Sequence, residues 1–443
     1  MFRAARILSV PLTLSVAACS LLSLSGCGSS DDSQQPVAGA GGDNPTGGGS
    51  SNANGGEGGA GKGGAGKGGA DNGSAGKGGA GKGGESNVAG RGGSNAAGGG
   101  GGSVPPVCNG APQWTDISTA QITALGGSAA QSYPGGVSGV LVNRSTGDVT
   151  IHIVGFGLWR SSDQGGTFAR LDGNVIDKNG GRTENGWGLQ SDPDDPTRMA
   201  TFTLDGSAGY TRDGKAWQGF ADSGWGRNWD FGAVDWSAAE AHTVFGVLHE
   251  TSPRNVYLIS TDGGMTWPAI DTSHVAAMVG VIDSKTLIAS RTSGIDRSTD
   301  LGSTWTSVSD VTPLSHVAIR FQSKYYVTTA NGVLVSADKG LTWKPQGVAI
   351  AAVKMFQGPY FGDDESTMVV GTQPDDNAFG NGSSIYKTTD GGASWTKIAD
   401  VPPLNNGFPI SYAWFGSFAW DPVNDIYYTS SMSNPAFRLD CVR

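Results

Sequence analysis

The sequence has few cysteines and little positive charge. Only four of its 443 residues are cysteine, and its 29 lysines and arginines are outnumbered by 39 aspartates and glutamates. Residues 1–107 hold seven basic and six acidic residues, so residues 108–443 hold the other 22 and 33 and carry a net charge of −11. This balance argues against a nucleic-acid partner, because nucleic-acid binding depends on basic patches that neutralise phosphates. It also argues against a strongly anionic polymer as the substrate, unless a local basic pocket receives it.

Helical periodicity is weak along the whole chain, and short alternating runs separated by Gly and Asp take its place. We therefore expect an all-β domain with very little helix. Glycine is concentrated in residues 28–107, where the segment Gly-Lys-Gly-Gly-Ala recurs. No expected strand precedes these glycines and no expected helix follows them, so they do not predict a phosphate-binding loop. A segment of this composition can bury no core, and it predicts a flexible tether with a reach of roughly 50 Å.

Residues 1–26 have the features of a bacterial secretory signal. Two arginines precede an apolar run over residues 7–24, and a polar stretch follows Cys27. Residues 24–27 resemble a lipobox, which implies cleavage before Cys27 and attachment of a lipid to it; a competing site of this kind ends at Cys19. A short transmembrane helix is the alternative, disfavoured because Pro11 and several serines interrupt the run. We expect an exported protein anchored to the bacterial membrane, at the outer membrane or cell surface.

The two remaining cysteines stand at the two ends of the expected folded region. Cys108 begins it and Cys441 lies near its end. In an exported chain, an isolated pair of this kind is most simply a disulfide, with two free thiols as the alternative. The expected organisation is a signal peptide over 1–26, a lipidated cysteine and Gly-rich linker over 27–107, and one domain over 108–443.

One pattern, Ser-x-Asp-x-Gly-x-Thr-Trp, returns six times in that domain, with Phe in place of Trp in the first copy and a shortened form in the second. The aspartates at its centre are Asp163, Asp213, Asp262, Asp300, Asp338 and Asp390. The Asp and Ser/Thr side chains can bond nearby backbone N–H groups, and Gly supplies a positive φ. The closing aromatic ring can pack between neighbouring sheets. The pattern therefore predicts a structural hairpin turn, with an ion or sugar site at each turn as the alternative.

The spacing of these aspartates predicts the architecture. Successive copies lie 50, 49, 38, 38 and 52 residues apart, which is the period of a four-stranded propeller blade. Residues 113–118 look like a strand that follows such a turn, and residues 436–440 look like a strand that precedes one. We therefore expect a seventh blade that takes three strands from the C-terminus and its outer strand from the N-terminus. This closure removes exposed sheet edges, and a Cys108–Cys441 bond would clamp it.

These octapeptides resemble the Asp-box (BNR) repeat of sialidase-like β-propellers. The resemblance covers six positions between residues 161 and 395 and implies a single seven-bladed propeller with its boxes at the rim. Sialidases carry an Arg-Ile-Pro motif that this sequence lacks. Residues 203–210 partly match the segment that carries a catalytic Asp in xyloglucanases, which make their cleft between two propellers. Photosystem II stability factors are similar single propellers without catalytic activity.

Function is expected on the loops that lead into the first strand of each blade and on those between the second and third strands. The catalytic candidates there are Asp205, Asp230 and Glu184. The ligand-binding candidates are Arg182, Trp187, Trp225, Arg227, Asn228, Trp229, His249, Tyr412 and Trp414. Aromatic rings stack on pyranoses while amides and carboxylates bond hydroxyls, so this set favours a sugar. Packing between blades is the alternative for each Trp, and Asp222 and Glu250 are further carboxylates on these loops.

Two similar segments place a histidine before a first strand, at His274 and His316. Two imidazoles do not make a metal site, so we expect hydrogen-bonding roles and neither a metal nor a cofactor.

The sequence thus favours a surface-anchored lipoprotein that binds or processes glycan, similar to a glycoside hydrolase. The alternative is a protein-binding or assembly module without catalysis. Two carboxylates facing each other in an aromatic cleft would favour the enzyme, and aromatic and amide groups without such a pair would favour the binder.

Overall fold

The computed structural model describes residues 112–128, 135–176, 187–204, 206–225, 228–237, 242–268, 272–375, 382–402, 412 and 416–440. The described chain is all-β with one short helix, α1 (Thr119–Ala124), as the weak helical periodicity predicts. Nothing in these ranges is a helix that is long and apolar enough to cross a membrane. Several residues that the sequence singles out lie outside the described ranges: Cys19, Cys27, Cys108, Cys441, Arg182, Glu184, Asp205, Arg227 and Trp414.

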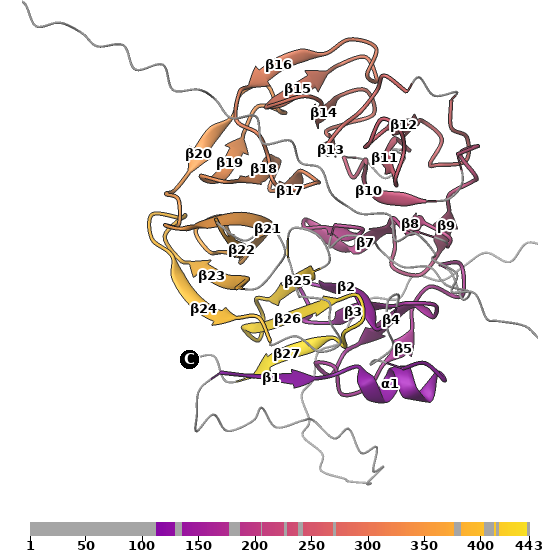
Figure 1. Ribbon diagram of the computed structural model, residues 1–443, viewed down its shortest axis with the longest axis vertical. Helices are drawn as coiled ribbons and strands as arrows, with labels where there is room; N and C mark the ends of the chain where they lie inside the picture. The colour runs from indigo at the N-terminus through magenta and orange to yellow at the C-terminus, as the bar shows by residue number, and fades with distance from the viewer. Residues whose placement is uncertain are drawn as a thin grey trace, which may run out of the picture. The chain divides into compact units, whose positions relative to one another are not determined.

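The described strands form seven antiparallel sheets, numbered here in chain order (Figure 1). Sheet 1 holds β2 (Val137–Val142), β3 (Val149–Ile153), β4 (Gly157–Ser161) and β5 (Ala169–Arg170). Sheet 2 holds β6 (Leu189–Asp192), β7 (Asp195–Thr201), β8 (Gly209–Thr211) and β9 (Trp217–Gly219). Sheet 3 holds β10 (Trp229–Val234), β11 (Val244–Leu248) and β12 (Tyr257–Ser260).

The remaining sheets continue the series. Sheet 4 holds β13 (Met278–Val281), β14 (Leu287–Ser290), β15 (Ile295–Ser298) and β16 (Thr306–Ser309). Sheet 5 holds β17 (Ile319–Phe321), β18 (Lys324–Thr329), β19 (Gly332–Ser336) and β20 (Lys344–Gln346). Sheet 6 holds β21 (Val353–Phe361), β22 (Met368–Pro374), β23 (Ser384–Thr388) and β24 (Thr396–Asp400). Sheet 7 holds β25 (Gly416–Asp421), β26 (Ile426–Ser431), β27 (Phe437–Asp440) and β1 (Gln113–Asp116).

Sheet 7 combines segments from the two ends of the described chain. β1, indigo in Figure 1, pairs with the yellow β27 in antiparallel register, with Trp114 opposite Leu439. The contact continues past the strands, because the backbone N–H of Ile117 donates to the carbonyl of Ala436 over 3.0 Å. The backbone N–H of Ala436 in turn donates to Oγ of the buried Ser118 over 2.8 Å.

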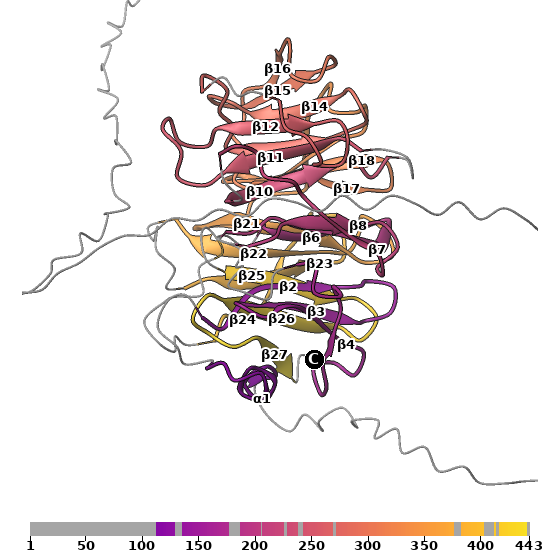
Figure 2. The ribbon, with the colours of Figure 1, turned by 90° about the vertical axis from the view of Figure 1, so that its right-hand side faces the viewer.

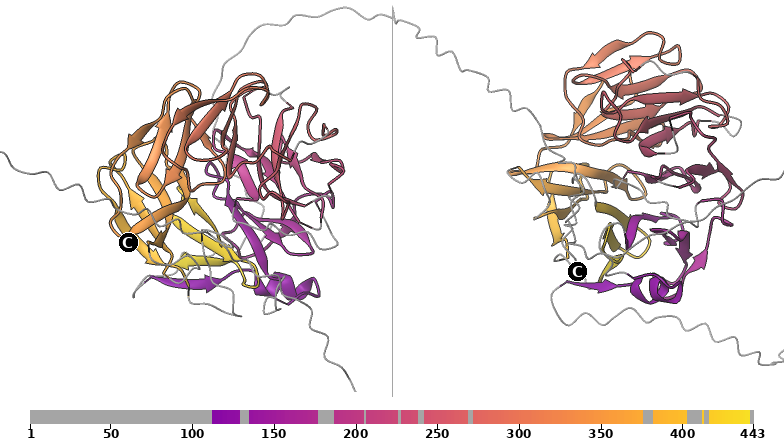
Figure 3. Two further views of the ribbon diagram at one scale, coloured as in Figure 1. Left: turned by 45° about the horizontal axis from the view of Figure 1, so that its top comes forward. Right: turned by 45° about the vertical axis from the view of Figure 1, so that its right-hand side comes forward.

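Each sheet packs against the next. β2 contacts both β6 and β25, β10 contacts both β7 and β13, and β21 contacts both β18 and β25. Sheets 4 and 5 are joined by a bridge between Val279 and Val317. Further views show the same succession of sheets (Figures 2 and 3). Consecutive antiparallel sheets, six of four described strands and one of three, that pack on one another are the architecture of a β-propeller.

The repeated pattern forms the turn after the third strand of its sheet, as the sequence predicts. In the turn after β12, the Asp262 carboxylate accepts hydrogen bonds from Ser260 Oγ (2.7 Å) and from Thr266 N (2.9 Å) and Oγ1 (2.6 Å). The Gly264 N–H donates to Ser260 Oγ, with Gly264 at a φ of 79°. Equivalent contacts are made around Asp163, Asp300, Asp338 and Asp390. In the shortened copy, Asp213 receives the backbone N–H groups of Lys215 and Ala216.

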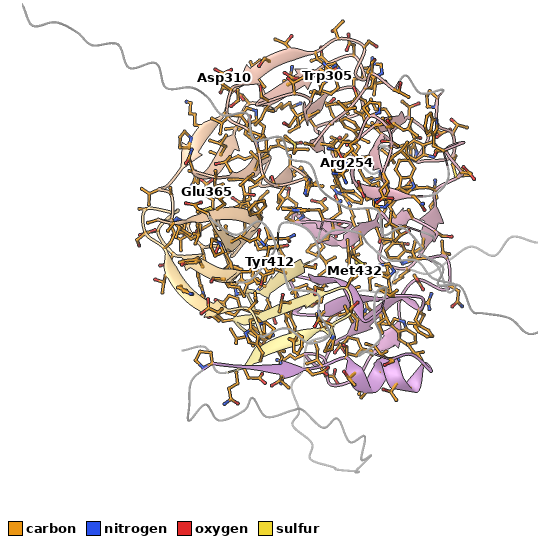
Figure 4. The ribbon with its side chains drawn as sticks, viewed as in Figure 1. Arg254, Trp305, Asp310, Glu365, Tyr412 and Met432 are labelled. Atoms are coloured by element: carbon orange, nitrogen blue, oxygen red, sulfur yellow. The ribbon has the colours of Figure 1, made fainter. Side chains whose placement is uncertain are left out.

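The closing aromatic ring of each turn packs into the core toward the preceding sheet. Trp267 lies 4.6 Å from the ring of Trp229 and donates its indole N–H to the carbonyl of Ala221. Trp305, marked in Figure 4, packs near Phe245 and Tyr257. These turns therefore fasten neighbouring sheets through local hydrogen bonds and an apolar ring, and no ligand is needed for that role.

These turns predict an acid-sensitive stabilisation. Hydrogen bonds from the Thr266 hydroxyl and backbone lower the pKa of Asp262 to about 2, and those from Ser394 do the same for Asp390. A pKa below its unfolded value of about 3.9 means stabilisation that is complete above about pH 4 and is lost as the pH falls through 2. We expect the melting temperature of Asp262→Asn to lie below that of wild type at pH 7 and to approach it near pH 2. Thermal unfolding measured across this pH range tests the expectation. The exposed Asp310→Asn is the control, and a wild-type advantage independent of pH would contradict the mechanism.

Candidate functional site

A β-bulge marks the start of β10. The register between β10 and β11 shifts between Trp229 and Phe231, which leaves Asp230 as the extra residue. Bulges of this kind re-aim a side chain at the end of a strand. Asp230 Oδ1 lies 2.7 Å from Nδ1 of His249, the first residue after β11. The backbone N–H of His249 donates to the carbonyl of Asn228, so three of the sequence candidates meet at one end of sheet 3.

A second carboxylate faces the other nitrogen of the same imidazole. Glu250 Oε2 lies 3.6 Å from His249 Nε2, and Glu250 has a φ of 47°, in the left-handed region that a non-glycine residue seldom adopts. The Asp230 and His249 side chains are 18% and 15% exposed, whereas that of Glu250 is 69% exposed. Asp230 thus orients the ring, and both carboxylates present acceptor oxygens to hydroxyl donors.

Trp225 presents an aromatic ring on the loop that leads to this site. Its side chain is 48% exposed, which is unusual for so large an apolar group. The loop is shaped by local hydrogen bonds, since Asp222 Oδ1 accepts from the N–H of Gly224 and Ser223 Oγ from that of Trp225. The exposed ring, Asn228 and Asp230 therefore belong to one segment of the chain, between β9 and the start of β10.

The other described aromatic candidates are buried residues. Trp187, Trp229 and Tyr412 are 5%, 1% and 0% exposed. Trp229 packs against Trp267 and Phe202, and Tyr412 (Figure 4) packs near Phe418. Their burial favours the alternative, packing between blades, and Trp187 also lines the cavity described below.

The two repeated histidines take part in packing and hydrogen bonding. His316 Nδ1 lies 3.0 Å from the carbonyl oxygen of Ala277, and its ring lies 4.7 Å from that of Phe231. The His274 ring lies 5.6 Å from that of Tyr257. Across the part of the chain that the structure describes, no group of three His, Cys, Asp or Glu side chains is arranged to hold a metal ion.

The first strands of all seven described sheets line one cavity of about 100 Å³. A charged network that the sequence analysis did not anticipate lies beside it. The buried Asp192, at the turn between β6 and β7, lies 3.4 Å from Arg198 and 3.3 Å from Arg320 of β17. Burial raises the pKa of Asp192, against the lowering effects of the Asp194 N–H and Arg320. Arg320 also pairs with Asp194 at 3.1 Å, so side chains from sheets 2 and 5 meet across the cavity.

No family model matches the chain, and no curated protein matches it either. Among solved structures, a GH74 enzyme from Niastella koreensis has 18% identity over 70% of this chain, with a TM-score of 0.43. The chain spans 53% of that enzyme, about half its length. YCF48 bound to D1 peptide has 12% identity over 77% of this chain and 98% of that chain, with a TM-score of 0.39.

The Cps50 (Swd1) β-propeller domain of Myceliophteria thermophila has 10% identity over 70% of this chain and 98% of that chain, with a TM-score of 0.46. The similar structures are thus β-propellers that include an enzyme and a protein bound to a peptide.

Proposed function

We propose that this chain is an exported, lipid-anchored protein whose folded domain is a seven-bladed Asp-box β-propeller that binds glycan at the ends of β10 and β11. Seven described sheets, each in contact with the next, support seven blades. The pairing of β1 with β27 and the contact of β25 with β2 support closure of the ring by the N-terminal strand. The signal-like residues 1–26, Cys27 and the Gly-rich linker support export on a lipid tether.

The observation that carries the binding proposal is the cluster of Asp230, His249 and Glu250 next to the loop of Trp225. Carboxylate oxygens, an oriented imidazole and an exposed indole are the groups that bond sugar hydroxyls and stack on pyranose faces. Retention of glycan is favoured over hydrolysis because Asp230 and Glu250 both face one imidazole instead of facing each other across an aromatic cleft. Of the described rings expected to form such a cleft, Trp187, Trp229 and Tyr412 are buried and only Trp225 is exposed.

Catalysis is the second candidate, and the 2.7 Å contact between Asp230 and His249 favours it. A carboxylate that orients an imidazole is a common arrangement for general base catalysis. Asp205 and Glu184, the other catalytic candidates, lie outside the described residues. Binding of a protein partner to the same loops is the third candidate, and an experiment must distinguish it from glycan binding and from catalysis.

A glycan panel tests the proposal. The soluble domain, residues 108–443, would be assayed on neutral and acidic oligosaccharides for retention and for release of reducing ends. We expect retention without release, weakened about 10-fold or more by Trp225→Ala or Asp230→Asn, since a stacked ring and a charge-assisted hydrogen bond each contribute over about 1 kcal/mol.

The matched control is Trp395→Phe, in a box turn at sheet 6, which should leave retention unchanged. Release of reducing ends by wild type that is lost in Asp230→Asn would show that the protein is an enzyme and would overturn the proposal of binding without hydrolysis. Neither retention nor release on any glycan would overturn the sugar proposal and favour a protein partner.

A further inference from the structure

The cavity between the first strands has walls that are rich in aromatic rings. Elements of five sheets supply them: Trp187 and Trp236 beside β6 and β10, Tyr325 of β18, Phe361 of β21 and Trp420 of β25. Each of these side chains keeps between 3% and 7% of its surface accessible to water, so a molecule in the cavity can contact them. Aromatic pairs attract each other beyond the effect of their buried area, so this lining favours an aromatic ligand.

Polar groups of the lining already have partners inside the protein. The Tyr325 hydroxyl donates to the carbonyl of Ile282 over 3.0 Å, and the Trp420 indole N–H donates to Asp425 Oδ1 over 2.9 Å. Gln190 also lines the cavity, and its amide N–H donates to a backbone carbonyl of β10 over 2.6 Å. These rings therefore offer the cavity their apolar surface. A sugar is disfavoured there, because its hydroxyls would lose water without gaining enough partners.

The two arginines of the lining also have counter-charges. Arg320 pairs with Asp192 at 3.3 Å and with Asp194 at 3.1 Å. Arg144 donates to two backbone carbonyl oxygens and interacts electrostatically with Asp194 and Asp363. A charged ligand would lose its water and meet charges that are already compensated, so its burial would be unfavourable. The ligand that suits this cavity is therefore neutral.

We propose that this cavity binds a small neutral aromatic molecule of one ring. An engineered protein cavity of about 150 Å³ with Leu, Ile and Phe walls stays dry and takes up benzene. The present cavity has about 100 Å³, which suits one ring and excludes a second, fused ring. Water is a poor occupant, because a buried water needs roughly two to four polar partners. The site is separate from Asp230, His249 and Glu250, none of which lines the cavity.

Fluorobenzene is the probe, and the fluorine NMR signal of the ligand is followed as the purified full chain is titrated into it. The comparison ligands are para-fluorobenzoate, which adds a charge, and fluorocyclohexane, which keeps one ring without its aromatic character. We expect saturable binding of fluorobenzene. The binding of para-fluorobenzoate should be at least about 100-fold weaker, because a buried charge without a partner is unfavourable. The binding of fluorocyclohexane should be about 10-fold weaker, because it lacks the attraction between aromatic rings.

Two variants fill the cavity from different sheets. Ala318→Leu, next to β17, and Ser191→Leu, in β6, add apolar volume at positions that line the cavity. Each should weaken fluorobenzene binding about 10-fold or more, because the new side chain and the ligand compete for the same space. Ala393→Leu is the matched control, since Ala393 is exposed in the box turn of sheet 6, where the box of sheet 5 carries Leu341. This control variant should bind fluorobenzene as wild type does.

The proposal is overturned if fluorobenzene does not bind wild type saturably, or if para-fluorobenzoate or fluorocyclohexane binds as tightly. It is also overturned if a folded cavity-filling variant binds fluorobenzene as well as wild type, because the probe then lies elsewhere. Thermal unfolding of each variant shows whether it is folded. Should Ala318→Leu fail to fold, Ser191→Leu decides.

Discussion

Deletion of residues 112–118 will lower the midpoint of thermal unfolding by roughly 6 °C. This segment contains β1, which pairs with β27 across four residue positions. The deletion also removes the indole N–H of Trp114 that donates to the carbonyl of Asp400 over 2.8 Å, and the Ser118 hydroxyl that receives the N–H of Ala436. Losing these hydrogen bonds and exposing the β27 edge costs on the order of 4 kcal/mol, which produces a shift of that size.

The control is a deletion of equal length, residues 95–101, in the Gly-rich segment. Calorimetry of both deletions in the full chain separates the loss of β1 from the loss of chain length. We expect the 95–101 deletion to have the same melting temperature as wild type. Equal melting temperatures for wild type and the β1 deletion would contradict the proposed closure of the ring by the N-terminal strand.

Asp192→Ala will cost about 3–5 kcal/mol of unfolding free energy, measured by urea denaturation. Asp192 has no exposed side-chain surface, and it is within 3.4 Å of both Arg198 and Arg320. Removing one partner of a buried ion pair leaves the opposite charges uncompensated, which costs far more than the pair itself contributes. Because Arg320 comes from sheet 5 and Asp192 from sheet 2, the loss will loosen a contact across the cavity.

Asp195 offers the matched control three residues away. It pairs with the same Arg198 at 3.0 Å, but its side chain is 40% exposed. A pair in contact with water contributes little, so Asp195→Ala should cost about 1 kcal/mol or less. Similar losses for the two variants would show that burial of Asp192 is not the cause.

The fold followed from the sequence because its signals are local. Asp262 with Ser260 and Thr266 specifies a turn within seven residues, so each copy of the pattern could be placed without knowledge of its neighbours. The pairing of residues 113–116 with residues 437–440 was also predictable, because each segment lacked the neighbouring strand that normally accompanies it. Strand pairing and turn chemistry were thus predictable from short stretches.

The site was predictable only in part. Strand order alone indicated that Asp230 and His249 lie at the same end of sheet 3, and they do. Whether a Trp on a loop is exposed depends on what packs over it, and Trp229 is covered by Trp267 from 38 residues further along. Asp192 and Arg320 had no sequence signal, because a turn of sheet 2 and a strand of sheet 5 meet only after the sheets have formed.

Hydrogen exchange of the domain with and without a retained oligosaccharide tests the central claim most directly. The account predicts slower exchange in peptides covering residues 222–232 and 246–252, which carry Trp225, Asp230, His249 and Glu250, and no change at the six Asp-box turns. Slower exchange at the box turns, or at loops remote from β10 and β11, would contradict the placement of the binding site.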